Sequence, residues 1–203
     1  MSEKTESISR GPSDHNVRVQ IVEAAAEHFS RYGYEKTTVS DLAKAIGFSK
    51  AYIYKFFDSK QAIGEVICAN TLNAILGAVN EAMQGSPTAS ERFRRMFKAV
   101  VEASIDLFFQ DRKLYDIAAS AAGQEWQSCV AYQDQIKQII LEIIREGRES
   151  GEFERKTPVD ETANAIYLVM RPYTNPLLLQ HNLSLAEEVP VILSGLVLRS
   201  LSP

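Results

Sequence analysis

The sequence predicts an all-α protein. Apolar residues recur at spacings of three and four over most of the chain, which is the period of an amphipathic helix. Serine, threonine or aspartate precedes many of these segments and glycine follows them, as expected for helix caps and stops. Alternating patterns typical of strands are nearly absent. We therefore expect three short helices near the amino end and about six longer ones after them.

Composition limits the classes of protein that the chain can belong to. Its 203 residues are 45% hydrophobic and 24% charged, which is typical of a globular protein with a sizeable core. The two cysteines, Cys68 and Cys129, are far apart in sequence and have no neighbouring histidine or cysteine. This spacing argues against a disulfide framework or a zinc site and fits a reducing compartment. We expect no metal and no cofactor.

The amino end and the hydropathy pattern give an expectation about localisation. The first 16 residues are polar and lack the apolar segment of a signal peptide. No apolar run reaches the length needed to cross a bilayer. Both observations predict a cytoplasmic protein.

Charge is unevenly distributed along the chain. Residues 1–60 hold nine basic side chains against eight acidic ones, a net +1, whereas the other 143 residues hold thirteen against eighteen, a net −5. Within residues 31–60 the count is six to three, a net +3. This asymmetry is typical of an amino-terminal unit that faces a polyanion and a carboxyl-terminal unit that does not.

Local signals set the helices of the amino-terminal unit. Residues 1–13 are polar and read as a disordered tail. A helix is expected over 14–32, stopped by Gly33, and a second one after Thr38, stopped by Gly47. Ser49 is placed as the amino-terminal cap of a third helix over 50–57. We expect a first domain over 14–60.

The remaining helices are expected to form a second domain over 61–203, connected to the first by a helix over about 60–84. Thr88 and Glu91 predict a capping box for a helix that extends to about 109. Further helices are expected over 111–123, 125–149 and about 158–181, the last of them disturbed by its internal prolines. Ser184 and Glu187 predict a capping box for a final helix to about 200, which Pro190 should bend.

Residues 37–60, TTVSDLAKAIGFSKAYIYKFFDSK, match the plan of a helix-turn-helix. The crossing of two helices needs a small residue, which Ala43 supplies, and the turn needs a residue that tolerates positive φ, which Gly47 supplies. The exposed face of the second helix would then present four side chains to solvent, namely Lys50, Ala51, Tyr52 and Lys55. The residues assigned to packing within the motif are Leu42, Ala43, Ile46, Gly47, Phe48, Ile53 and Phe56.

The stretch TTVSDLAKAIGFSKAYIYKFFDSKQAI over 37–63 resembles the signature of the TetR family of transcriptional regulators. The resemblance is specific over about residues 17–67. Three positions depart from the usual pattern: Ala51 replaces a glycine, Phe56 a histidine and Gln61 a glutamate. The matching residues are Thr37, Thr38, Val39, Leu42, Ala43, Gly47, Ser49, Ile53, Tyr54, Phe57, Ser59, Lys60 and Ile63.

The resemblance implies roles for individual residues in binding double-stranded DNA. Base edges in the major groove would be met by Ser40, Lys50, Ala51 and Tyr52. Phosphates would be met by Thr38, Tyr54, Lys55 and Lys60. An alternative for Tyr54 is a plain core position, and for Lys50 and Lys60 a solvated surface.

The resemblance also implies what the second domain does. Its last two helices, over about 158–200, would pair with a second copy of the chain to give a homodimer. A small apolar or aromatic effector would bind among its other helices and release the protein from its operator. The side chains expected to line that pocket, each of which could equally be ordinary core, are Phe93, Phe97, Val100, Phe108, Tyr115, Trp126 and Tyr132.

We therefore expect a ligand-responsive regulator that acts as a repressor, binds a palindromic operator as a homodimer and is not an enzyme. One alternative is a helix-turn-helix protein whose main partner is another protein. A second is an all-helical enzyme that uses the aromatic cavity, although the sequence presents no paired nucleophile and base.

Overall fold

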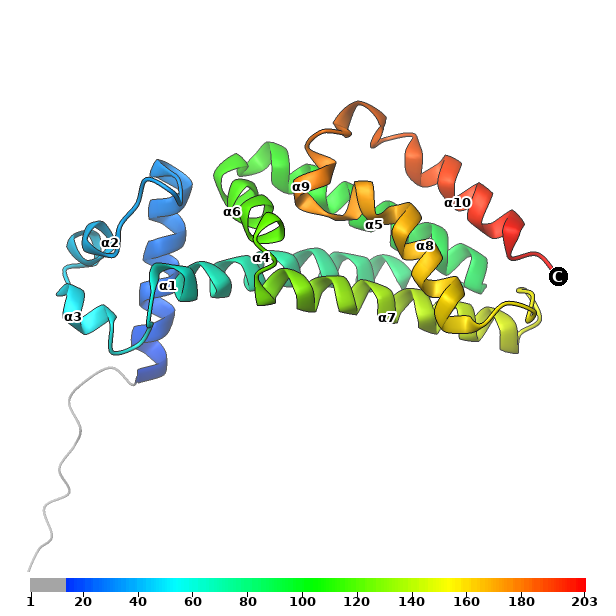
Figure 1. Ribbon diagram of the computed structural model, residues 1–203, viewed down its shortest axis with the longest axis horizontal. Helices are drawn as coiled ribbons and strands as arrows, with labels where there is room; N and C mark the ends of the chain where they lie inside the picture. Colours follow the sequence, from blue (N-terminus) through cyan, green and yellow to red (C-terminus); the bar gives the residue numbers. More distant parts are fainter. Residues whose placement is uncertain (1–13) are drawn as a thin grey trace, which may run out of the picture. The chain divides into compact units, whose positions relative to one another are not determined.

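The computed structural model describes residues 14–203, so the tail expected over 1–13 lies outside the described residues (Figure 1). The described residues form helices joined by turns, which confirms the all-α class. The chain divides into two compact units, Met1–Ile63 and Gly64–Pro203, and the division falls inside α4 (Lys60–Met83). Each unit is described by itself below.

The first unit is built from α1 (Asp14–Tyr32), α2 (Val39–Ile46), α3 (Lys50–Ile53) and the first residues of α4. Helix α1 packs against α2, and α2 packs against α3. Burial of one apolar face from each helix removes enough hydrocarbon from water to hold this small unit together. The largest fully buried side chains of its core are Ile21, Phe29, Leu42, Ile53 and Ile63.

Helix α3 is shorter than the helix predicted over 50–57. It ends at Ile53, and the chain continues in turns whose hydrogen bonds span three residues, from Lys55 N to Tyr52 O at 3.2 Å and from Phe56 N to Ile53 O at 2.9 Å. Such a tightened last turn satisfies carbonyl groups that would otherwise lack a partner. Of the helix predicted over 50–57, only Lys50–Ile53 is therefore α-helical, and residues 54–57 continue it as turns.

The second unit contains most of α4 and the helices that follow it. These are α5 (Ala89–Gln110), α6 (Arg112–Gly123), α7 (Gln127–Glu149), α8 (Val159–Thr174), α9 (Pro176–Leu179) and α10 (Val189–Ser200). Helix α7 packs on α8 and α5, α10 packs on α5 and α8, and α6 packs on α9 (Figure 1). The core is a continuous layer of buried aliphatic and aromatic side chains from these helices.

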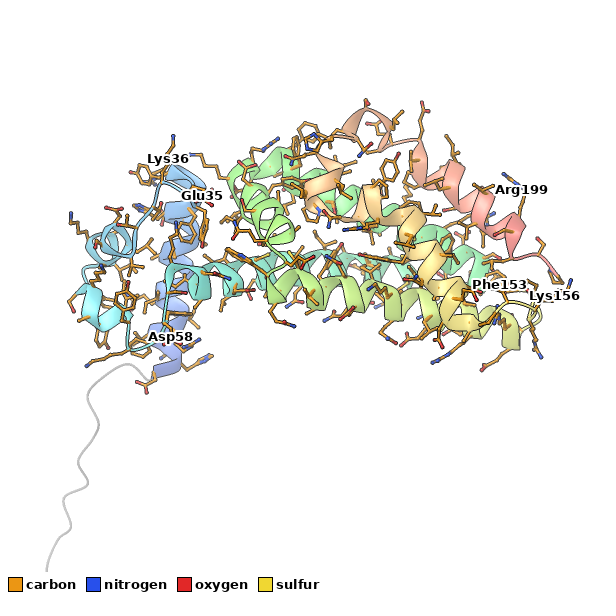
Figure 2. The ribbon with its side chains drawn as sticks, in the orientation of Figure 1. Glu35, Lys36, Asp58, Phe153, Lys156 and Arg199 are labelled. Carbon is orange, nitrogen blue, oxygen red and sulfur yellow. The ribbon has the colours of Figure 1, made fainter. Side chains whose placement is uncertain are left out.

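The connection between α7 and α8 depends on a glycine. Phe153 folds back so that its ring lies against Gly147, and a Cβ at position 147 would overlap that ring. The amide of Phe153 donates to the Gly147 carbonyl at 2.9 Å, and the amide of Glu154 donates to Leu201 O at 2.7 Å. Figure 2 shows Phe153 at this end of the unit. The turn is thereby fixed to both α7 and the residue after α10.

The start of the last helix differs from the prediction. Residues Leu183–Leu185 form a short 3₁₀ helix, and α10 begins only at Val189. Pro190 lies in the first turn of α10, where its missing N–H would have no partner inside the helix in any case. The capping box expected at Ser184 and Glu187 is therefore wrong, and Pro190 lies in the first turn of the helix instead of bending it.

One helix within residues 14–203 is long and apolar enough to span a membrane by length and composition alone. It is α4, whose most apolar window has a mean hydropathy of 1.5 and is 44% buried in the structure. This finding differs from the prediction that no apolar run reaches the length needed to cross a bilayer. A core helix passes the same test, so the observation is weak evidence for a membrane span.

Candidate nucleic-acid interface

The α2–turn–α3 motif is held by caps at both helix starts. The Thr38 hydroxyl accepts from the Asp41 amide at 3.2 Å, and the Asp41 carboxylate accepts from the Thr38 amide at 2.9 Å, which is a capping box. Hydrogen bonds from the hydroxyl and amide of Thr38 hold the pKa of Asp41 below its ordinary value. Ser49 caps α3 as predicted, because its hydroxyl accepts from the Tyr52 amide at 3.1 Å.

Gly47 makes the turn between the two helices. Its φ of 78° lies in the left-handed region, which costs other residues about 1–2 kcal/mol. The amides of Gly47 and Phe48 donate to carbonyls of α2, Lys44 at 3.4 Å and Ala43 at 2.9 Å. The predicted requirement for a residue that tolerates positive φ is met at this position.

Helix α3 and the turn after it present two lysines and an alanine to solvent. Lys50, Ala51 and Lys55 are exposed, as is Tyr54, of which 43% is accessible. The ammonium of Lys50 lies 5.7 Å from the Tyr54 ring centre, and that of Lys55 lies 5.6 Å from the Tyr52 ring centre. Both distances are within the range of a cation–π attraction, so the rings and charges form one mixed surface, called the α3 face below.

Tyr52 has a second role that the sequence did not indicate. Its ring stands edge-on to Phe48 at 5.0 Å and to Phe56 at 5.3 Å, which makes a row of three aromatic rings along α3. All three side chains are partly exposed. Phe57, rather than Phe56, is the aromatic residue that enters the core, with 3% of its surface accessible.

The residues expected to pack the motif divide into two groups. Leu42, Ala43 and Ile53 are buried, whereas Ile46, like Phe48 and Phe56, is only partly buried and Gly47 is exposed. The buried members join α2 and α3 to the core of the unit. Of the partly buried members, Phe48 and Phe56 flank the Tyr52 ring at the edge of the α3 face.

The other residues expected to contact DNA are Thr38 and Lys60, assigned to phosphates, and Ser40, assigned to a base edge. Thr38 is exposed but its hydroxyl already serves the α2 cap, while Ser40 is partly buried in the first turn of α2. Lys60 donates to Tyr34 O at 3.0 Å, and its ammonium lies 4.2 Å from the Tyr34 ring centre. An ammonium has three donors, so Lys60 keeps capacity for an anion.

Arg18 is a cation of this unit that the sequence did not single out. Its guanidinium lies 4.3 Å from the Phe57 ring centre and donates to the Phe56 carbonyl just after α3. Arg18 lies on the exposed face of α1, next to the buried Val17. In the sequence, the basic side chain of Arg18 was the only feature that could have indicated this contact. The contact joins α1 to the turn that follows α3.

Charged side chains also mark the connections of the unit. Figure 2 shows Glu35 and Lys36 at the α1–α2 connection and Asp58 at the turn before α4, at opposite ends of α1. The acidic Asp58 therefore lies near the end of the α3 segment, and its charge partly offsets that of the neighbouring lysines. The net charge of +3 over residues 31–60 includes these residues.

The residues expected to line an effector pocket lie in the core of the second unit. Phe108 alone among them is partly exposed, and the other six are buried. A surface cavity of about 360 Å³ in this unit is lined from α5 and α10 by other residues, including Lys98 and Pro190. The expected residues are Phe93, Phe97, Val100, Phe108, Tyr115, Trp126 and Tyr132.

Two buried tyrosines bring polar groups into this core. Tyr115 donates its hydroxyl to the carbonyl of Pro176, and its ring stands edge-on to Phe108 at 4.8 Å. The hydroxyl of Tyr132 has no hydrogen-bond partner among residues 14–203, although that of Ser104 is near it and donates instead to Val100 O at 2.7 Å. Burial raises the pKa of Tyr132 well above its ordinary value. An unpaired buried hydroxyl is costly unless a ligand or a water satisfies it.

Both parts of the chain match known protein families. Residues 21–66 match the model described as "Bacterial regulatory proteins, tetR family". Residues 89–187 match the model described as "Tetracyclin repressor-like, C-terminal domain". The two matches together cover more than half of the chain and include the α2–turn–α3 motif.

Individual proteins show the same likeness. YhgD of Bacillus subtilis, named an HTH-type transcriptional regulator, is 28% identical over 138 residues, which are 64% of this chain and 69% of YhgD. IcaR of Staphylococcus aureus is 40% identical over 60 residues, which are 28% of this chain and 32% of IcaR. The match to IcaR therefore spans about a third of that protein.

A solved structure extends the likeness to nearly the whole fold. PfmR, a TetR family transcriptional regulator from Thermus thermophilus, is 26% identical and has a TM-score of 0.56. The likeness covers 88% of this chain and 97% of PfmR. This chain belongs to the TetR family of bacterial transcriptional regulators.

Proposed function

We propose that this regulator is a ligand-responsive repressor that binds a palindromic DNA operator as a homodimer. Residues 14–60 act as the DNA-binding domain, and residues 61–203 bind the effector and form the dimer. The observation that carries the proposal is the α3 face, where Lys50 and Lys55 lie beside aromatic rings. IcaR, which is named a negative transcriptional regulator, supports repression as the direction of control.

The α3 face suits the major groove of DNA. Lys50, Ala51 and Tyr52, with Ser40 of α2, meet base edges, and the methyl group of Ala51 suits a thymine methyl. Thr38, Tyr54, Lys55 and Lys60 meet phosphates, which set the register of the protein on the duplex. The cost of desolvating these cations is repaid by the release of counterions from the DNA.

A homodimer is supported by apolar side chains that the single chain leaves in water. Leu168 and Val169 of α8 are 53% and 40% exposed, and Val191, Ile192 and Leu196 of α10 are 74%, 58% and 54% exposed. Exposed apolar patches of this kind mark interfaces. Pairing of α8 and α10 with the same helices of a second copy gives an isologous four-helix interface.

The dimer also explains how short helices can select an operator. One α3 face reads only a few base pairs, whereas two of them about 34–36 Å apart read two half-sites one helical turn from each other. Sedimentation of the protein at micromolar concentration should give the mass of a dimer. If the protein sediments as a monomer at that concentration, the proposed homodimer is wrong, and so is the palindromic operator that depends on it.

The effector is a small apolar or aromatic molecule held among α4 to α7. The unpartnered hydroxyl of Tyr132, in a unit whose core contains buried aromatic side chains, supports such a site, because one polar group in an apolar pocket fixes the orientation of a ligand. The effector must bind one arrangement of α4 better than another, because only differential affinity shifts a conformational equilibrium. The protein is released from the operator if, in the arrangement that the effector favours, the distance between the two α3 faces no longer matches the distance between the two half-sites.

Titration of labelled DNA tests the proposal. The probe is the DNA upstream of the regulator's own gene, and the control is a scrambled duplex of equal length and composition. Affinity should exceed that for the control, and should fall with salt at a log–log slope near −0.9 for each phosphate contacted. Affinity that does not depend on salt would overturn DNA binding through the α3 face.

A further inference from the structure

Cys68 and Cys129 lie side by side in the core of the second unit. Their Sγ atoms are 3.9 Å apart, although 61 residues separate them in sequence. Cys68 is on α4 and Cys129 is on α7, and both are free thiols that are almost fully buried. They are the only two cysteines of the 203-residue chain. Any disulfide within one chain must therefore join this pair.

The surroundings of the pair tie α4 to the first turn of α7. The Glu65 carboxylate of α4 accepts from the amides of Gln127 and Ser128 at 3.1 and 3.0 Å. One helical turn along α4, Cys68 meets Cys129 of α7, whose thiol is also 3.8 Å from the carbonyl of Ala118. The Glu65 contacts hold the start of α7 against α4 next to the two sulfur atoms, so oxidation need not bring distant segments together.

The two thiols differ in their readiness to ionise. The hydrogen bond with Cys129 holds the pKa of Cys68 below its ordinary value, although burial and the charge of Glu65 act against this. The same hydrogen bond, with burial, raises the pKa of Cys129. The Cys129 thiol also has the Ala118 carbonyl as an acceptor at 3.8 Å, which favours the form in which Cys129 keeps its proton. Because the thiolate is the reactive form, this contact and the lower pKa of Cys68 together assign Cys68 as the sulfur that reacts first.

We propose that Cys68 and Cys129 are a site of reversible oxidation, at which a peroxide converts the two thiols into a disulfide that crosslinks α4 to α7. The Cys68 thiolate attacks a peroxide oxygen, the O–O bond breaks, and hydroxide leaves. The hydroxide takes up the proton that the Cys68 thiol released, so Cys68 sulfenic acid and one water form. The Cys129 sulfur then loses its proton and attacks the Cys68 sulfur, and the S–O bond breaks to release a second water. The thiols lose two electrons, which reduce hydrogen peroxide to two waters.

The crosslink changes the position of the helix that leads into the DNA-binding unit. A disulfide is about 2.05 Å long, so the sulfur atoms must approach by about 1.9 Å through side-chain rotation and movement of α4 or α7. Helix α4 is continuous from Lys60, in the first unit, through Cys68 to Met83. The disulfide therefore restrains α4 against α7 more tightly than the two thiols do, and oxidation weakens operator binding because α4 leads into the unit that carries the α3 face. This step rests on the proposed function.

Thiol chemistry tests the site without DNA. The purified full-length protein is treated with hydrogen peroxide, denatured, and assayed for free thiols, with mass spectrometry of its peptides. The expected result is the loss of both thiols, a peptide pair joined through Cys68 and Cys129, and recovery of both thiols with dithiothreitol. Thiols that persist under this treatment, or disulfides that join two chains instead, would overturn the site.

Single substitutions separate the two roles. Cys129→Ser should leave Cys68 able to reach the sulfenic acid, which a dimedone label detects, but unable to go further to the disulfide. Cys68→Ser should give neither product at matched peroxide concentration. Cys129→Ala and Cys68→Ala serve as second variants where a buried serine hydroxyl disturbs folding, as judged by circular dichroism. Equal labelling of Cys129 in the Cys68 variants would overturn the assigned order.

Operator titration then tests the consequence. The oxidised protein should bind the operator about tenfold or more weakly than the reduced protein, a coupling of ordinary size for an allosteric site. For each of the two variants, Cys68→Ser and Cys129→Ser, the affinity for the operator should be the same with and without peroxide, because neither can form the disulfide. A disulfide that forms without any change in affinity would overturn the switch and leave the proposed function intact. A reduced protein that fails to bind DNA would overturn the proposed function, and the thiol assay would still decide the site.

Discussion

The carboxylate of Glu65 on α4 accepts a hydrogen bond from the amide of Gln127, the first residue of α7, at 3.1 Å. Its second oxygen accepts from the Ser128 amide at 3.0 Å. The first amides of a helix lack partners inside the helix, and the N-cap residue here, Trp126, has an indole that can only donate. A side chain 62 residues earlier therefore supplies the cap, and the negative charge also suits the helix dipole.

Removal of this cap should lower stability by a measurable amount. Glu65→Ala should reduce the free energy of unfolding in urea by about 1 kcal/mol, because two amides of α7 lose their acceptor. Glu65→Gln keeps one acceptor oxygen and should lose less. Glu142→Ala, which truncates an exposed glutamate on α7, is the control and should change little. Equal losses for Glu65→Ala and Glu142→Ala would contradict the capping role.

Two glycines offer a matched test of backbone conformation. Gly47→Ala should destabilise the protein by about 1 kcal/mol, because φ at this position is 78° while nothing crowds the added methyl group. Gly77→Ala, in the interior of α4 and equally uncrowded, should stabilise it by about 0.5–1 kcal/mol, because alanine loses less entropy in a helix. Both changes are read from urea unfolding curves. Shifts of the same sign would refute the conformational explanation.

Sequence reasoning succeeded where the signal was local. Three kinds of feature were predicted correctly, and each depends on residues within about four positions of each other. They are the bounds of α1, the caps at Ser49 and Thr88, and the positive φ of Gly47. A hydroxyl three residues before an amide is enough to start a helix in any surroundings. The family signature is equally local, which is why the residue pattern over 37–60 was sufficient to locate the helix-turn-helix.

It failed where distant residues meet. The distance between Cys68 and Cys129, the Glu65 cap of α7 and the contact of Arg18 with Phe57 each join residues at least 38 positions apart. The periodicity of the sequence does not predict such long-range contacts, because they depend on how whole helices pack against each other. The prediction about Pro190 was wrong for a different reason. A proline is compatible both with a bend inside a helix and with the first turn of a helix. Because the preceding residues form a 3₁₀ helix and α10 begins at Val189, Pro190 lies in the first turn.

Lys50 and Lys55 should affect DNA binding in different ways. Lys55→Ala should weaken binding to all sequences similarly and reduce the log–log salt slope by about 0.9 per half-site, as expected for one lost phosphate contact. Lys50→Ala should cost about 1–3 kcal/mol on the operator and less on scrambled DNA, because a base contact is lost. Fluorescence anisotropy at several salt concentrations measures both effects.

The control for these lysines is an exposed lysine of the second unit. Lys98→Ala on α5 removes a cation of equal charge whose side chain is 64% exposed. Its operator affinity and salt slope should match those of the unaltered protein. A reduction in slope as large as that of Lys55→Ala would show that net charge, and not the α3 face, controls binding.

Glu152 should make stability depend on pH in the acid range. Burial, the largest single influence, opposes its ionisation, but hydrogen bonds from the amides of Ala89 and Ser90, at 3.0 and 3.1 Å, hold its pKa below the ordinary value of 4.5. A carboxylate whose pKa is lower in the folded state stabilises that state above the unfolded pKa, and loses this effect as pH falls through the folded pKa. Glu152→Gln, which stays neutral, should therefore be less stable than the unaltered protein at pH 7, and the difference should shrink as pH falls below about 4.5. Urea unfolding at a series of pH values measures this difference, and a gap that stays constant down to pH values well below 4.5 would show that the charge of Glu152 does not stabilise the start of α5.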